Sequence, residues 1–344
     1  MGGTEHLTVQ REGATLVLTL NRPEARNALS LPMLVGLHDG WLEADADDTV
    51  RSIVFTGAGG SFCSGMDLKA LAGNGMAGEE YRDRLKADPD LHWKAMLRHH
   101  RPRKPVIAAV EGYCVAGGTE MLQGTDIRVA AESATFGLFE VKRGLFPIGG
   151  STVRLQRQIP RTHALEMLLT GRPYSAREAA AIGLVGHVVP DGTALGRAME
   201  IAEQINACGP LAVEAVKASV YESAEMSEQD GLAAELTRGW PVFDTADAKE
   251  GARAFAEKRP PVYRRAWASR DHRSASARGA APEVAGSEPR VVGGRASSSP
   301  RPGRGAPCTP ISKEAGPRCP QFSRRRSSSN FPSPAPSGPS RAPS

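Results

Sequence analysis

Two glutamates, Glu120 and Glu140, lie twenty residues apart in this chain, and each follows a glycine-bearing turn. Glu120 is near the end of AVEGYCVAGGTEM (Ala109–Met121), and Glu140 ends FGLFE (Phe136–Glu140). A third glycine turn lies upstream in FCSGMDLKA (Phe62–Ala70). Two carboxylates can hold a water molecule, and backbone N–H groups at such turns can polarise a carbonyl. The combination predicts a site for acid–base chemistry on a carbonyl compound.

The surroundings of Glu120 favour a site over a solvated helix residue, which is the ordinary position of an isolated glutamate. Val106–Val110 (VIAAV) is a short apolar run typical of a buried strand. Gly117 and Gly118 let the backbone approach a ligand closely, and a helix is expected from Thr119. Free N–H groups at a helix start favour negative charge on a ligand.

The rest of the pattern predicts an α/β domain with a helical C-terminal part. A capping box of Ser175 and Glu178 predicts the start of one helix, and Gly183 is expected to end it. Strands are expected at Thr15–Leu20, Ser52–Thr56, Val106–Val110, Ile127–Ala131 and Gly186–Val189. Helices are expected at Leu31–Ala44, Thr152–Gln158, His163–Leu169, Ala176–Ala181, Leu195–Ala207 and over several stretches from Leu211 to Glu257.

Five blocks of sequence, in the same order, resemble the enoyl-CoA hydratase/isomerase (crotonase) superfamily, and most of all an enoyl-CoA hydratase. The resemblance runs from about His6 to about Arg264. The first block is similar to the family's loop against the adenosine end of coenzyme A, and the second to its FCAGADLK motif. The blocks are NRPEARNALS (Asn21–Ser30), FCSGMDLK (Phe62–Lys69), the core signature (Gly117–Leu155), LTGRPYSAREAAAIGLVGHVVP (Leu169–Pro190) and KEGARAFAEKRPP (Lys249–Pro261).

The resemblance implies the fold and the reaction. We expect an α/β crotonase-like spiral of β-β-α repeats over residues 1–200 and a C-terminal helical oligomerisation region over residues 201–264. The family assembles as a trimer, often as a hexamer of two trimers. The implied reaction adds water across the 2,3 double bond of a 2-enoyl-CoA thioester to give a 3-hydroxyacyl-CoA, in fatty-acid or related acyl-CoA breakdown.

The resemblance also assigns roles. Glu120 activates the water, while Glu140 also holds the water and protonates Cα. The backbone N–H groups of Met66 and Gly117 form the oxyanion hole. Two close carboxylates in a partly apolar site repel, so one should keep a proton near neutral pH. Neither a metal nor a permanently bound cofactor is expected, since coenzyme A enters as part of the substrate. The expected coenzyme A and substrate contacts are Ala25, Asp67, Leu68, Lys69, Phe255 and Lys258.

Several residues depart from the family pattern. Ala116 replaces the first glycine of the usual triple glycine, and Thr125 stands where Cys is common. Phe139 replaces the proline before the second acid, and Ile148 replaces a glycine in the turn that follows. Met66 stands where the family often has Ala, but the oxyanion hole needs only its backbone. Because Phe139 and Ile148 flank Glu140, they put the choice of acyl group in question first.

Cysteine usage and hydropathy bear on the compartment. The five cysteines include no C-x-x-C pair, which favours free thiols in a reducing compartment over a disulfide framework or a zinc site. No run of about 18 apolar residues occurs, and the start MGGTEHLTVQ lacks a signal-peptide pattern. We therefore expect a cytoplasmic protein without a membrane partner.

The composition changes near residue 264. Residues 265–344 carry 14 Lys and Arg against four Asp and Glu, a net charge of +10, so residues 1–264 carry −5 of the total of +5. This Ser, Pro and Arg-rich tail is expected to be disordered, because it has too little apolar surface to offset its ordering entropy. Three interpretations stay open for it. They are a solvated extension, a polyanion-binding segment through RRRSSS (Arg324–Ser329), or an out-of-frame extension of the gene.

Alternatives to hydration also stay open. Other reactions of the superfamily use the same oxyanion hole, including enoyl-CoA isomerisation, acyl-CoA hydrolysis and decarboxylation. The presence of both acids favours hydration among them. A non-enzymatic protein that binds a polyanion through its basic tail is a further alternative, although we expect no nucleic-acid partner.

Overall fold

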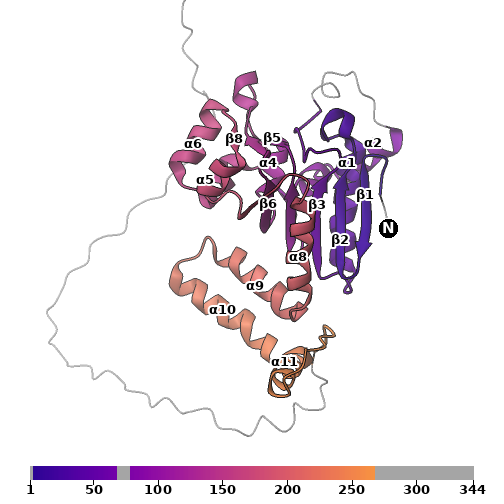
Figure 1. Ribbon diagram of the computed structural model, residues 1–344, viewed down its shortest axis with the longest axis vertical. Helices are drawn as coiled ribbons and strands as arrows, with labels where there is room; N and C mark the ends of the chain where they lie inside the picture. Colours follow the sequence, from indigo (N-terminus) through magenta and orange to yellow (C-terminus); the bar gives the residue numbers. More distant parts are fainter. Residues whose placement is uncertain (1–2, 68–77, 268–344) are drawn as a thin grey trace, which may run out of the picture. The chain divides into compact units, whose positions relative to one another are not determined.

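A computed structural model describes residues 3–67 and 78–267 of the chain (Figure 1). Leu68, Lys69 and the tail beyond Trp267 lie outside the described residues. A six-stranded sheet runs in the order β1-β2-β3-β4-β6-β9. Its first pair is antiparallel and its other pairs are parallel. The strands are β1 (Leu7–Glu12), β2 (Thr15–Leu20), β3 (Ser52–Gly57), β4 (Val106–Val110), β6 (Ile127–Ala131) and β9 (His187–Val189).

The central strands β2, β3 and β4 are buried on both faces, since their side chains point alternately to opposite sides and both sides are covered. One face contributes Leu18, Phe55 and other residues to a core that also contains Trp41 of α1 (Leu31–Ala46). The opposite face, with Val54, packs on α8 (Ala194–Asn206) through Ala198 and its neighbours. The near-continuous apolar runs that predicted the strands are explained by this two-sided burial.

A second, three-stranded sheet has the order β5-β7-β8, formed by Tyr113–Val115, Thr135–Gly137 and Tyr174–Ser175. The chain alternates between the sheets, since β4 is followed by β5 and β6 by β7. After β5 comes α4 (Gly117–Leu122), so strand, strand and helix form a repeating unit. After β7 come the 3-10 helix η3 (Glu140–Arg143) and α5 (Ser151–Gln158).

The remaining helices lie outside the two sheets, and the last three of them form the C-terminal region (Figure 1). The capping box at Ser175 is present, with both of its hydrogen bonds, and Gly183 has a positive φ of 80° just after that helix. None of the described helices is long and apolar enough to cross a membrane. These helices are α2 (Glu79–Ala87), α3 (Leu91–Ala95), α6 (Arg161–Thr170), α7 (Ala176–Ala181), α9 (Pro210–Ser223), α10 (Glu228–Phe243) and α11 (Ala246–Ala256).

The folded part extends beyond the boundary expected at residue 264. The Arg265 backbone N–H donates to Asp247 at 2.8 Å, and its guanidinium pairs with Glu214 at 2.5 Å. The Ala246 N–H donates to the Ala266 carbonyl at 2.9 Å, and Trp267 forms a bridge with Thr245. Residues 265–267 therefore belong to the helical region, because the start of α11 needs their backbone groups.

Candidate active site

Glu120 lies in the first turn of α4 and is 5% exposed. The helix begins after Ala116, whose φ of 50° and ψ of −124° turn the chain sharply out of β5. Gly118 must be a glycine, since a Cβ there would lie 2.5 Å from the Cys63 carbonyl oxygen. The Ala116 N–H donates to the Gly137 carbonyl at 2.7 Å, which fixes the start of α4 against the end of β7. Glu120 and the segment leading to Glu140 are thus held by the same small sheet.

The Gly65 turn lies against the start of α4. Gly65 has a φ of +91°, and a Cβ there would lie 2.7 Å from the Ala116 Cβ and 3.1 Å from the Gly117 nitrogen. On either side of Met66, the Gly65 carbonyl and the Asp67 N–H bond to the backbone of Leu29. Among the described residues, neither the Met66 N–H nor the Gly117 N–H donates to a protein acceptor. The structure therefore places the Gly65 turn, which carries the Met66 N–H, beside the Gly117 N–H, and the role of these two donors in an oxyanion hole stays a prediction from the family resemblance.

Glu140 is the first residue of η3 and is half-buried. Its Oε2 atom, like Oε1 of Glu120, is buried without a hydrogen-bond partner among the described residues. A buried carboxylate oxygen without a donor is costly, so each of these oxygens is suited to a group supplied by a substrate or a water molecule.

The two carboxyl groups influence each other. Burial, followed by the charge of Glu140, raises the pKa of Glu120 from 4.5 to about 7. Burial also raises the pKa of Glu140, although the charge of Arg143 opposes the shift. The titration steps of such a pair belong to both groups together. Both shifts are in the direction that favours a protonated carboxyl group, and that one of the two acids keeps a proton near neutral pH stays a prediction.

Three residues around Glu120 were not predicted from the sequence, namely Gly149, Ser151 and Gln123. A Cβ at Gly149 would lie 2.5 Å from Glu120 Oε2, so the backbone after Pro147 touches the carboxylate. The backbone N–H groups of Ser151 and Gly149 and the Ser151 hydroxyl face Glu120 and lower its pKa against the effect of burial. Gln123 Nε2 donates to the Ser151 hydroxyl at 2.7 Å. The signal available in the sequence was the glycine pair Gly149-Gly150 followed by Ser151, which begins nine residues after Glu140.

The predicted contacts near the first loop lie together. Ala25 ends the short helix η1 (Pro23–Ala25), and its carbonyl accepts from the Ser64 hydroxyl at 3.2 Å. Asp67 pairs with Arg22 at 2.6 Å, an ion pair that fixes this loop to the Gly65 turn. The first loop and the candidate oxyanion hole therefore form one unit.

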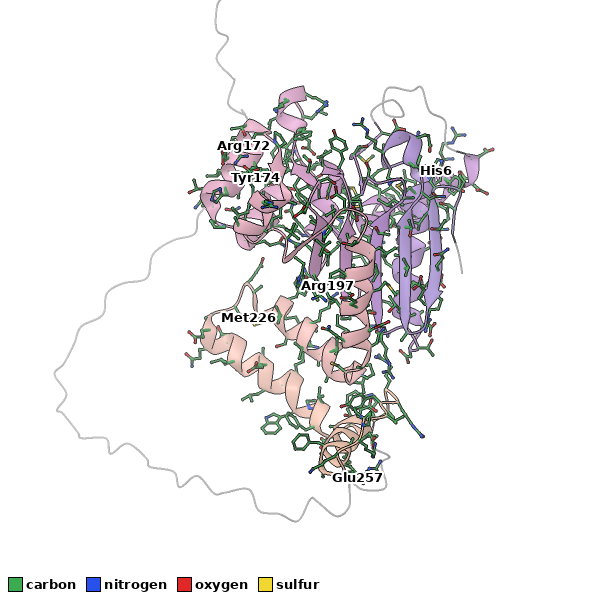
Figure 2. All side chains as sticks on the ribbon, in the orientation of Figure 1. His6, Arg172, Tyr174, Arg197, Met226 and Glu257 are labelled. Atoms are coloured by element: carbon green, nitrogen blue, oxygen red, sulfur yellow. The ribbon has the colours of Figure 1, made fainter. Side chains whose placement is uncertain are left out.

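The predicted contacts at the end of α11 are separate from this unit. Phe255 is 88% exposed, and Lys258 follows the helix with a φ of 57°. Glu257, labelled in Figure 2, caps the end of α11 and lies between these two residues in the sequence. No contact among the described residues links Phe255 or Lys258 to Glu120 or to the Gly65 turn.

Known proteins are similar to this chain in both sequence and fold. The family model for enoyl-CoA hydratase/isomerase matches residues 10–266. Enoyl-CoA hydratase EchA19 of Mycobacterium tuberculosis is 52% identical over 255 residues, which cover 74% of this chain and 95% of that protein. (E)-Benzylidenesuccinyl-CoA hydratase of Thauera aromatica is 36% identical over 261 residues, covering 75% of this chain and 98% of that protein.

A solved structure gives the same result. The crystal structure of an enoyl-CoA hydratase from Mycobacterium tuberculosis superimposes with a TM-score of 0.69 at 40% identity, covering 76% of this chain and 99% of that chain. The alternating strands of the two sheets are thus the crotonase spiral predicted from the sequence. The match extends over most of the chain in sequence and in structure, and the chain belongs to the enoyl-CoA hydratase/isomerase family.

Proposed function

We propose that the protein is an enoyl-CoA hydratase, which adds water across the 2,3 double bond of a 2-enoyl-CoA thioester to give a 3-hydroxyacyl-CoA. The observation that carries the proposal is that Glu120 and Glu140 each have a buried carboxylate oxygen without a partner among the described residues, in the same fold as two backbone N–H groups that donate to no described protein acceptor. The hydratase names of the relatives support it.

Hydration of a 2-enoyl thioester requires stabilisation of the negative charge that develops on the carbonyl oxygen. Attack of water on Cβ moves the electrons of the double bond toward the thioester carbonyl, whose oxygen becomes enolate-like. The Met66 and Gly117 N–H groups stabilise that charge, at about 3 kcal/mol for each donor. Glu120 takes a proton from the attacking water and Glu140 supplies the proton to Cα. Each turnover returns one proton to the pair, so the water is added without an oxidant or a metal.

Coenzyme A binding is part of the same proposal. The backbone of Ala25, together with Asp67, Leu68 and Lys69, would lie along the cofactor moiety of the substrate next to the Gly65 turn. Phe255 and Lys258 would meet the adenine and the 3′-phosphate of a substrate bound in a neighbouring subunit, which suits their position apart from Glu120. No permanently bound cofactor is required, since the two acids and the backbone donors supply the chemistry.

A panel of 2-enoyl-CoA thioesters tests the reaction, with the loss of the enoyl absorbance as the readout. Glu120→Gln and Glu140→Gln should each lower hydration by at least about 10²-fold. Their combination should cost far less than the product of the two, because both acids act on one water molecule. Glu132→Gln, at an exposed acid paired with Arg177, is the matched control and should leave the rate unchanged.

The outcomes separate the alternatives. Double-bond migration, thioester cleavage or loss of CO₂ without hydration would replace the proposal by another superfamily reaction. Near-normal hydration in either single variant would remove the assignment of that acid. A protein without acyl-CoA activity that binds polyanions in a salt-sensitive manner would favour the non-enzymatic alternative.

We further propose a trimer or hexamer. The C-terminal helices expose large apolar side chains, which soluble monomers rarely gather in one region. The proposal predicts a mass of three or six chains in light scattering at micromolar concentration, and an active monomer would contradict it. The exposed residues are Val216, Val220, Leu232, Leu236, Trp240 and Phe243.

The cellular setting is proposed on chemical grounds. Cys63 and Cys114 are buried free thiols, as suits a reducing compartment such as the cytoplasm. Hydration of 2-enoyl-CoA thioesters is a step of fatty-acid and related acyl-CoA breakdown, which we propose as the metabolic context.

A further inference from the structure

Gln123 lies directly after α4 and is 2% exposed. Its Nε2 donates to the Thr119 carbonyl at 3.1 Å and to the Ser151 hydroxyl oxygen at 2.7 Å. Its Oε1 is buried without a partner among the described residues. An unsatisfied buried carbonyl is unfavourable for stability, so folding alone does not account for this amide.

The contacts of Gln123 fix the direction of a hydrogen bond. A carbonyl can only accept, so the amide nitrogen, and not the oxygen, must face Thr119. The same nitrogen also donates to the Ser151 hydroxyl oxygen, which accepts this hydrogen bond through a lone pair. The hydroxyl hydrogen of Ser151 is therefore available to donate to another acceptor. Ser151 is fully buried at the start of α5, two residues after Gly149, where an added Cβ would lie 2.5 Å from Glu120 Oε2.

The two oxygens of Glu120 differ in their surroundings. Oε2 lies at the Gly149 backbone, on the side that Ser151 and Gly149 approach with their donors. Oε1 is buried and has no hydrogen-bond partner in the part of the chain that the structure describes. Among the described residues, the donors of Ser151 and Gly149 form no short hydrogen bond with the carboxylate. Catalytic hydrogen bonds are often long in a protein without substrate and shorten when the substrate binds.

We propose that Gln123 and Ser151 are positioning residues, in which Gln123 directs the Ser151 hydroxyl and this hydroxyl holds Glu120 so that Oε1 faces the reacting water. The reaction itself rests on the proposed function, but the relay can be tested without it. Because Gln123 acts through Ser151, the effects of the two residues on Glu120 should not be independent.

The test is an infrared titration of the Glu120 carboxyl in glutamate-labelled protein, with Glu120→Gln to assign the signal. Ser151→Ala should raise the pKa of Glu120 by about one unit, because it removes a donor to the charged form. Ser151→Thr should restore the value, and Gln123→Leu should raise it by a smaller amount. In the Ser151→Ala background, Gln123→Leu should have no further effect.

Two controls make the result specific. Thr125→Val removes another buried hydroxyl near α4, bonded to the Leu122 carbonyl at 2.7 Å, and should leave the titration of Glu120 unchanged. Glu140 and Arg154 are the other charged groups that act on Glu120 or respond to its charge. Repeating the series in Glu140→Gln protein separates a direct effect on Glu120 from a change in the carboxyl pair. Thermal melts establish that each variant is folded.

Hydration kinetics give the second readout. In Ser151→Ala, kcat should fall about tenfold while KM stays within about twofold, because Ser151 acts on the base and not on the substrate. Additive shifts for Gln123→Leu and Ser151→Ala, or no shift in either, would overturn the relay. Shifted titrations in a protein that has no hydratase activity would instead retain the relay and reject the proposed function.

Discussion

At the scale of single residues, the chain keeps a carboxyl group where burial opposes its charge. Glu120 is 5% exposed and its pKa is raised from 4.5 to about 7. A group poised near the working pH is an effective proton acceptor, whereas an ordinary glutamate would be a weaker base. The benefit to catalysis is therefore obtained at a cost in stability whenever Glu120 is ionised.

Glu120→Gln should accordingly stabilise the protein in a pH-dependent way. Because the pKa of Glu120 is higher in the folded state than in the unfolded state, its protonation stabilises the fold. This stabilisation is fully present below pH 4.5 and is lost as the pH rises through about 7. The variant has no charge to bury, so above pH 7 it should be more stable than the wild type by about 3 kcal/mol. Denaturant unfolding at equal protein concentration, at pH 5 and pH 8, measures the difference. An equal difference at both values would contradict the assignment of the pKa.

Gly149→Ala should displace the Glu120 carboxylate. The new Cβ would lie 2.5 Å from Oε2 and 2.7 Å from the carboxyl carbon. We expect hydration to fall by about 10²-fold, the scale of losing acid–base catalysis, while the protein stays folded. Gly196→Ala in α8 is the matched control, since a Cβ there meets no atom within 4 Å. Equal activity in both variants would show that Glu120 tolerates the shift.

At the scale of elements, the sequence predicted those strands and helices whose residues have a recognisable hydrophobic pattern. The strands β2, β4 and β6 are apolar runs buried on two faces, and their predicted bounds agree with the structure. Strands β5, β7 and β8 have two or three residues, too few for any periodicity, and were not predicted. The half-polar edge strand β1 and the polar α2 were also missed.

The residues of the candidate active site were likewise predicted only where the sequence has a local pattern. Glu120 and Glu140 were found because glycine turns precede them in the chain. Gln123 and Ser151 were not found, since they meet only through the packing of α5 against the end of α4. A contact between residues so far apart leaves no local signal in a single sequence.

Asp126 joins α9 to the strands and should dominate the stability of that junction. It accepts from Lys217 Nζ and from the Tyr221 hydroxyl, each at 2.7 Å. Asp126→Asn leaves the buried Lys217 without its counter-charge and should destabilise the protein by about 3 kcal/mol. Adding Lys217→Met should recover part of that loss.

Denaturant unfolding measures these changes, and an exposed ion pair serves as the control. Asp83 and Lys86 are 61% and 74% exposed, so Asp83→Asn should cost less than about 0.5 kcal/mol. Similar effects of Asp126→Asn and Asp83→Asn would mean that α9 is not anchored through Asp126.

At the scale of the whole molecule, residues 265–267 belong to the folded part, although the composition already changes near residue 264. Residues 268–344 carry 13 Lys and Arg against four Asp and Glu, so their removal leaves a protein with a net charge of −4 in place of +5. Residues 265–267, in contrast, supply partners to Asp247, Ala246 and Glu214.

Two truncations separate these contributions. A chain ending at Trp267 should keep the melting temperature and the hydratase activity of the full protein, and lose retention on a polyanion column because its net charge changes sign. A chain ending at Arg264 should melt about 5 °C lower, since it leaves the Ala246 N–H, Asp247 and Glu214 without the partners that residues 265 and 266 provide. Equal melting temperatures would show that these contacts add nothing. A large rise in KM on truncation after Trp267 would instead mean that the arginines beyond it hold the phosphates of the substrate, and the tail would then belong to the site.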